Sequence, residues 1–142
     1  MIRKVDDSIS VAPQIAPEDM AAIRAAGFVA LVNNRPDDEQ EGQPAGDAIR
    51  AAALAAGLTY AAIPIGHAGF SHPQVQAMVD VLEGAEGPVL AFCRSGTRSC
   101  NLWALARARM GDAPDELIEK GAGAGYDLSG LRPLLDQLAA QA

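Results

Sequence analysis

Short apolar runs of strand length alternate along this chain with longer stretches in which apolar residues recur at helical spacing. The apolar runs predict strands at residues 9–11, 28–32, 58–63 and 89–92. The longer stretches predict helices at residues 17–27, 44–56, 71–86, 99–110, 114–122 and 128–140. Strand and helix therefore alternate over most of the chain.

Individual residues mark the ends of these elements. Ser71 and Gln74 stand at the spacing of a capping box, with Pro73 in the first turn, and together they predict the start of a helix. The continuous apolar run from 28 to 32 lacks polar alternation, which is typical of a parallel strand that is buried on both faces.

Alternation at this spacing predicts a three-layer α/β domain, with a four- to five-stranded, mainly parallel sheet flanked by helices. In such sheets a ligand binds beyond the carboxyl ends of the strands, at the loops that lead from each strand into the following helix. The loops expected at that edge are residues 33–38, 64–70 and 93–98.

Composition narrows the function classes. The chain has 142 residues, and we expect residues 1–142 to form one domain. A net charge of −7 disfavours a nucleic-acid partner, because the surface as a whole would repel phosphates. No apolar run approaches the roughly 20 residues that span a bilayer, and no signal segment opens the chain. We therefore expect a cytoplasmic protein without a membrane partner.

The segment from 89 to 99 carries the clearest chemistry, because it runs from a strand through a tight polar loop into a helix. Such a loop turns successive backbone N–H groups toward one point and adds the positive end of a helix dipole, which together bind an anion. Gly96 allows the backbone conformations that this turn needs. Cys93 opens the loop, so the same groups should stabilise its thiolate. Arg98 can hold two oxygens of an oxyanion at once.

These features predict Cys93 as a nucleophile and Arg98 as an anion clamp. The alternative for Cys93 is a buried core cysteine, which is common for this residue type. The alternative for Arg94 is a solvated surface charge rather than a role in substrate binding.

Residues on the two neighbouring loops are further candidates. His67 could donate a proton near neutral pH, or it could be an ordinary polar loop residue. Arg35 could add positive charge at the mouth of the site or lie on the surface. Asp37 could act as an acid or pair with Arg94, but acids in a proline-containing turn are often turn formers.

Two residues at the start of the following helix leave alternatives open. Ser99 could assist a leaving thiolate or cap the helix. Cys100 could resolve an oxidised Cys93 as a disulfide, or it could be a buried apolar residue. With only these two cysteines, the chain has neither a disulfide scaffold nor the paired spacing of a structural zinc site.

The run Cys93-Arg94-Ser95-Gly96-Thr97-Arg98-Ser99 resembles the active-site loops of rhodanese sulfurtransferases and of cysteine-dependent tyrosine and dual-specificity phosphatases. Together with Asn34-Arg35-Pro36-Asp37, Leu102-Trp103-Ala104 and Ala124-Gly125-Tyr126-Asp127-Leu128, it resembles most closely the phosphatase-like domain of β-lactamase-hydrolase-like proteins. Members of that bacterial family are also catalogued as sulfur transferases. The resemblance implies a dual-specificity-phosphatase-like fold and no metal or organic cofactor.

The resemblance also implies roles for residues of the loop. Cys93 would be the nucleophile, Arg98 the clamp, and the backbone amides of residues 94–98 the cradle for the anion. The predicted substrate-binding residues are Arg94, Ser95, Gly96, Thr97 and Ser99.

The chain departs from the phosphatase pattern in three places. Phe92 replaces the usual histidine, four residues rather than five separate Cys93 from Arg98, and the loop 64–70 lacks a carboxylate. A phosphate ester needs a proton for its leaving group, a contribution on the order of 10²–10⁴ in rate, whereas thiosulfate expels sulfite unaided.

The main hypothesis is therefore an enzyme that transfers sulfane sulfur from thiosulfate or a persulfide through a Cys93 persulfide. The alternative is a phosphomonoesterase that hydrolyses a phosphate ester through a Cys93-phosphate. A third hypothesis, from another class, is a pseudo-enzyme that only binds anions. In each case the expected ligand is a small anion.

Overall fold

The computed structural model describes residues 1–142 and contains one five-stranded sheet in the order β1-β2-β5-β3-β4. The strands are β1 (Arg3–Lys4), β2 (Ile9–Ala12), β3 (Ala30–Asn33), β4 (Thr59–Ala62) and β5 (Val89–Phe92). Only β1 runs antiparallel to its neighbour, and the other pairs are parallel. The predicted α/β fold with a mainly parallel sheet is confirmed.

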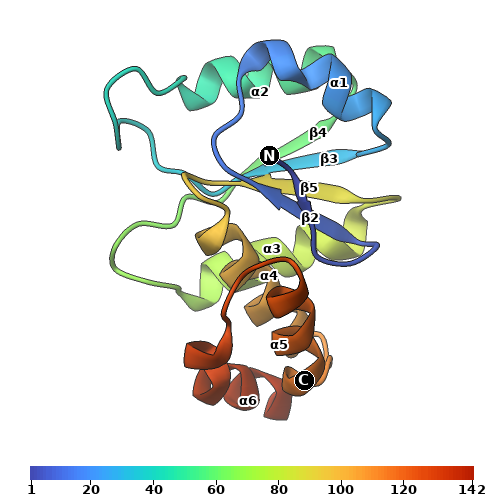
Figure 1. The fold of residues 1–142 in the computed structure, drawn as a ribbon, viewed down its shortest axis with the longest axis vertical. Coiled ribbons are helices and arrows are strands. Elements are labelled where there is room, and N and C mark those ends of the chain that lie inside the picture. Colours follow the sequence, from blue (N-terminus) through green and yellow to red (C-terminus); the bar gives the residue numbers. More distant parts are fainter.

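Helices cover both faces of this sheet (Figure 1). They are the 3₁₀ helix η1 (Pro17–Asp19), α1 (Met20–Ala25), α2 (Gly46–Ala55), α3 (His72–Gly84), α4 (Thr97–Arg109), α5 (Pro114–Gly123), the 3₁₀ helix η2 (Ser129–Leu131) and α6 (Arg132–Ala140). In Figure 1, α1 and α2 lie on one face of the sheet, and α3 and α4 lie on the other with α5 and α6 beyond them.

The hydrophobic core is divided in two by the sheet. Leu90 and Phe92 of β5 pack with the residues of α1 and α2, while Val89 and Ala91 pack with the residues of α3 to α6. This alternation follows from the pleat of a strand, whose successive side chains point to opposite faces. β5 is thus buried on both faces, and its carboxyl end is held firmly in place.

The structure differs from the sequence prediction mainly at element ends. β1 was not predicted, because two exposed charged residues carry no apolar signal, yet Arg3 and Lys4 pair with Val11 and Ser10 of β2. α4 begins at Thr97, two residues before the predicted start, because the turn at Gly96 leads directly into it. The predicted last helix begins as η2 and becomes α-helical only at Arg132.

α4 is the most buried helix of the fold. Most of its residues are buried, including Trp103, which is fully enclosed as expected for a core residue. The Trp103 indole nitrogen has no hydrogen-bond partner. Since α4 packs against the sheet on one side and against α3, α5 and α6 on the others, the loop at its amino end starts from a rigid support.

No helix of this fold combines the length and the apolar character needed to cross a bilayer.

The capping box at the start of α3 is confirmed. The Ser71 hydroxyl accepts from the Gln74 N–H at 3.3 Å, and the Gln74 side chain accepts from the Ser71 N–H at 2.8 Å. We expect Ser71→Ala to lower the free energy of unfolding by about 1 kcal/mol, because an orphan backbone donor of the helix loses its partner. Urea denaturation measures this loss. Glu83→Ala, an exposed change in the same helix, is the control, and an equal effect of both variants would contradict the role of the cap.

Candidate active site

Cys93 is the first residue after β5 and lies at the carboxyl edge of the sheet. Its sulfur accepts a hydrogen bond from the backbone N–H of Gly96 at 3.1 Å, and its own N–H donates to the Ala12 carbonyl at 3.2 Å. The side chain is fully buried, yet it belongs to neither of the two apolar clusters. The thiol therefore lies beneath a polar loop rather than within the apolar core.

Gly96 produces the turn that brings its N–H to the sulfur. Its φ of +89° lies in the left-handed region, and it is the residue immediately before α4. α4 therefore begins four residues after Cys93, and the N–H of its first residue, Thr97, donates to the Ser95 hydroxyl at 3.4 Å. The first N–H groups of a helix have no acceptor within the helix itself. The anion cradle formed by the amides of residues 94–98 stays a prediction.

Three of the five guanidinium N–H groups of Arg98 are engaged within the protein. Nη1 donates to Glu39 Oε2 at 2.7 Å and to the Ile65 carbonyl at 2.6 Å, and Nη2 donates to Glu39 Oε1 at 2.8 Å. The groups that remain are the Nε–H and the second hydrogen of Nη2, which lie parallel on one side of the guanidinium. Glu39 and Ile65 leave these two N–H groups unengaged, and a fork of this kind can bind two oxygens of an oxyanion.

Glu39 is a component of the site that sequence reasoning missed. Its carboxylate bridges Arg98 and Arg35, whose Nε donates to Glu39 Oε1 at 2.9 Å. Hydrogen bonds from Arg98, and secondarily from Arg35, lower the pKa of Glu39 to about 2 although partial burial opposes this. The carboxylate is thus ionised at neutral pH. Nothing in the local sequence could reveal this partnership, because 59 residues separate Glu39 from Arg98.

The pKa of Arg98 is raised in turn, first by its hydrogen bond to Glu39. A charge interaction and a hydrogen bond with Cys93 contribute to the same shift. The predicted nucleophile follows β5 directly, and the predicted clamp is the second residue of α4, so they lie at the two ends of one short loop.

Arg35 is buried in contact with Glu39 rather than exposed on the surface. It is 4% exposed, and besides Glu39 it donates to the side chains of Gln14 at 3.0 Å and Gln40 at 3.3 Å. The alternative of a surface role is wrong, because these contacts enclose the guanidinium. Its charge acts on the site through the Glu39 carboxylate.

Ser99 joins the start of α4 to the end of β3. Its hydroxyl donates to Asn34 Oδ1 at 2.8 Å, and the Asn34 side chain donates to the Ile63 carbonyl at 2.9 Å. The alternative of a helix cap is wrong for Ser99, because Gly96 occupies the cap position. Contact between Ser99 and a substrate stays a prediction, and its hydroxyl hydrogen is directed at Asn34.

A cavity of about 270 Å³ lies beside the loop and has only polar residues around it. These are Glu39, His67, Arg94, Ser95 and Arg98. The structure thus brings His67, the predicted alternative proton donor, to the same cavity as the predicted clamp. Arg94, Ser95 and Thr97 are exposed to solvent, and the Ser95 hydroxyl donates to Thr97 Oγ1 at 3.0 Å.

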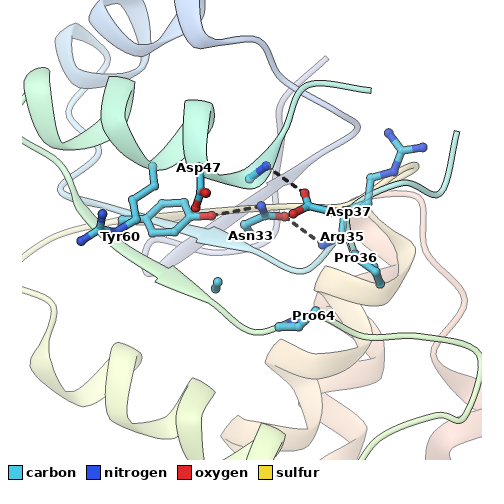
Figure 2. Close-up of a pocket in the computed structure, with 10 residues that line it drawn as sticks. Asn33, Arg35, Pro36, Asp37, Asp47, Tyr60 and Pro64 are labelled. Atoms are coloured by element: carbon cyan, nitrogen blue, oxygen red, sulfur yellow. Dashed lines mark hydrogen bonds between the residues drawn. The ribbon is translucent and has the colours of Figure 1, made fainter. Parts of the chain in front are cut away.

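Asp37 faces a different cavity, of about 180 Å³, at the ends of β3 and β4 (Figure 2). Asp37 Oδ1 accepts from the Gly46 N–H at 2.8 Å at the start of α2, and Asp47 and Tyr60 also line this space. The alternative in which Asp37 pairs with Arg94 is wrong, because the Asp37 carboxylate is engaged with α2. Its chemistry is therefore separated from the loop of Cys93.

Cys100 is fully buried within the apolar cluster beneath the sheet. Burial, with a smaller contribution from the Cys93 charge, raises the pKa of Cys100 to about 12. The interpretation of Cys100 as a buried apolar residue is confirmed.

Comparisons with known proteins concern the family and the fold of the chain. Residues 1–110 match the family model described as the phosphatase-like domain of beta-lactamase hydrolase-like protein. The chain is 34% identical over 126 residues to a beta-lactamase hydrolase-like protein of Agrobacterium fabrum, covering 88% of this chain and 29% of that protein. A relative from Xylella fastidiosa strain 9a5c is 31% identical over 138 residues, which cover 96% of this chain and 32% of that protein. The chain therefore spans about three tenths of the length of these relatives.

Solved structures give the same picture of the fold. A provisionally assigned phosphatase from Neisseria meningitidis Z2491 is 34% identical, with a TM-score of 0.81 over 96% of this chain and 97% of the other. TpbA of Pseudomonas aeruginosa, solved in complex with phosphotyrosine, is 19% identical and has a TM-score of 0.64. The alignment covers 99% of this chain and 89% of TpbA. These similarities confirm the dual-specificity-phosphatase-like fold.

The low pKa of Glu39 makes the bridge between Arg35 and Arg98 depend on pH. A carboxyl whose pKa falls from 4.5 to about 2 on folding contributes stability above pH 4.5 and loses it as the pH falls toward 2. We expect Glu39→Gln to lower the free energy of unfolding by about 1–3 kcal/mol at pH 7, because two arginines lose a charged partner. The difference from the unchanged protein should shrink as the pH falls below 4.5.

Urea denaturation at a series of pH values measures this difference. Glu119→Gln removes an exposed carboxylate and serves as the matched control. A deficit in Glu39→Gln that is the same at pH 3 and pH 7 would contradict an electrostatic role for Glu39.

Proposed function

Because this chain belongs to the family of beta-lactamase hydrolase-like proteins, through their phosphatase-like domain, we propose that it is a cysteine-dependent enzyme that transfers sulfane sulfur through Cys93. The donor is a small anion, thiosulfate or a persulfide. The cavity of about 270 Å³, surrounded by polar residues with two arginines among them, suits a guest of that size and charge.

The observation that carries this proposal is the ionisation state of Glu39, whose carboxylate lines the cavity beside the loop. Glu39 is ionised by its two arginine partners, so it has no proton to give at neutral pH. The loop 64–70 contributes no carboxylate of its own. Hydrolysis of a phosphate ester needs an acid for its leaving group, whereas expulsion of sulfite does not. The available groups therefore favour sulfur transfer.

The proposed step is a displacement at sulfur. The Cys93 thiolate attacks the terminal sulfur of thiosulfate, a new S–S bond forms, and the bond from that sulfur to the sulfonate group breaks. The electron pair of the broken bond leaves with sulfite. The thiolate and the thiosulfate dianion together carry the same charge as the Cys93 persulfide and sulfite, so no proton is consumed.

The roles of the surrounding groups follow from their geometry. The free fork of Arg98 would hold two sulfonate oxygens, and the N–H groups at the start of α4 would face the same anion. The Gly96 N–H would stabilise the thiolate before attack and the persulfide after it. Arg94 and Ser95, which are exposed at the cavity, would contact the guest as it enters.

A phosphomonoesterase is the second candidate, and one observation favours it. His67 lines the same cavity as Arg98 and could supply the proton that Glu39 cannot. In that reaction Cys93 would form a cysteinyl-phosphate while His67 protonates the departing alkoxide.

Mass spectrometry of the intact protein distinguishes the candidates. After incubation with thiosulfate and removal of excess donor, we expect the protein to gain the mass of one sulfur atom. Cys93→Ser should gain none, because its hydroxyl cannot form a persulfide, and Cys100→Ala should gain sulfur like the unchanged protein. An unmodified Cys93 in a protein that hydrolyses an aryl phosphate would overturn the proposal.

His67→Asn sharpens the comparison. Sulfur transfer should be retained within about twofold, because its leaving group needs no proton. Phosphate hydrolysis through His67 should fall by a factor on the order of 10² or more. Rates of sulfite release and of phosphate release from the same preparations measure both activities.

A further inference from the structure

Tyr126 contacts the Cys93 loop from a distant part of the chain. It lies just after α5 and outside residues 1–110, which the family model matches. Its hydroxyl donates a hydrogen bond to the Ser95 carbonyl at 3.1 Å. The proposed function gives this contact no role, although it joins the carboxyl-terminal region directly to the loop.

The Ser95–Gly96 peptide unit connects this contact to the nucleophile. In a planar trans peptide the carbonyl and the following N–H point in opposite directions. The Ser95 carbonyl points to the Tyr126 hydroxyl, and the Gly96 N–H of the same unit points to the Cys93 sulfur at 3.1 Å. One peptide plane is therefore fixed on both sides, and a bond to its carbonyl also polarises its N–H.

The close approach of Tyr126 depends on the absence of a side chain at Gly96. A Cβ placed on Gly96 would overlap the Tyr126 hydroxyl, in addition to being strained by the φ of +89°. The glycine thus serves the turn and also leaves room for the phenol. The positive φ of the turn and the space for the Tyr126 hydroxyl therefore both require glycine at position 96, next to Cys93.

Arg3 of β1 fixes Tyr126 from its other side. The guanidinium carbon lies 5.8 Å from the centre of the Tyr126 ring, a cation–π distance, and Nη1 donates to the Ala124 carbonyl at 3.1 Å. Gly125 has a φ of +95°, and a Cβ there would clash with Arg3. Two glycines therefore make room for a chain of contacts that runs from Arg3 through Tyr126 to the loop.

We propose that Tyr126 is a positioning residue for Cys93, which holds the Ser95–Gly96 peptide so that its N–H stabilises the thiolate. Arg3 supports this role by fixing the orientation of the phenol ring. The inference rests on Cys93 as the nucleophile of the proposed function. It does not depend on whether the substrate is thiosulfate or a phosphate ester.

The test is Tyr126→Phe, which keeps the ring and its packing against Arg3 but removes the hydroxyl. The rate of alkylation of Cys93 by iodoacetamide is measured against pH, with the modified residue identified by peptide mapping. We expect the midpoint of this curve to move to higher pH, because the freed peptide stabilises the thiolate less. Sulfite release from thiosulfate should fall about two- to tenfold in kcat/KM, the range of one net hydrogen bond.

Two further variants complete the experiment. Tyr60→Phe removes a phenol hydroxyl on the other side of the sheet and should leave the alkylation curve unchanged. Arg3→Met should move the midpoint in the same direction as Tyr126→Phe but by less, because the hydroxyl remains. The thermal midpoint of each variant shows whether the fold is intact.

A Tyr126→Phe curve that coincides with that of the unchanged protein would overturn the inference. So would equal shifts in Tyr126→Phe and Tyr60→Phe, since the effect would then not be specific to the loop. Alkylation needs no substrate, so a failure of the proposed sulfur transfer would leave this measurement intact and separately readable.

Discussion

The orientation of a single peptide unit, between Ser95 and Gly96, governs the geometry of the site. Its N–H meets the Cys93 sulfur because Gly96 adopts a left-handed conformation directly before α4. α4 cannot shift to accommodate another turn, since it is buried between the sheet and three other helices. A strand buried on both faces and a buried helix therefore leave the short loop between them little freedom.

The three loops at the carboxyl edge of the sheet are joined by polar contacts rather than by apolar packing. Glu39 and Asn34 follow β3, the Ile65 carbonyl follows β4, and Arg98 and Ser99 open α4. Each of these contacts is between a pair of residues far apart in the chain, so the site forms only when the sheet is assembled. The ionised state of Glu39 belongs to this assembly, because its pKa is set by arginines from two loops.

The sequence was informative wherever the signal was local. Apolar runs located β2 to β5, the Ser71 and Gln74 pair located the start of α3, and the order of strand, loop and helix identified the loop of Cys93. β1, Glu39 and Tyr126 were not assigned in this way, because their roles depend on partners in distant parts of the chain. A charged or aromatic residue that lies outside a regular apolar pattern gives no indication of where its partner lies in the fold.

The Glu39 carboxylate also limits how strongly the site can hold an anion. It cancels one of the two positive charges of Arg35 and Arg98, so the three side chains together keep a single positive charge. In the proposed sulfur transfer, an incoming dianion and a departing one of equal charge would experience the same attraction, so the site would favour neither over the other. Such a balance would avoid a tightly bound end state and would let the spent anion dissociate readily.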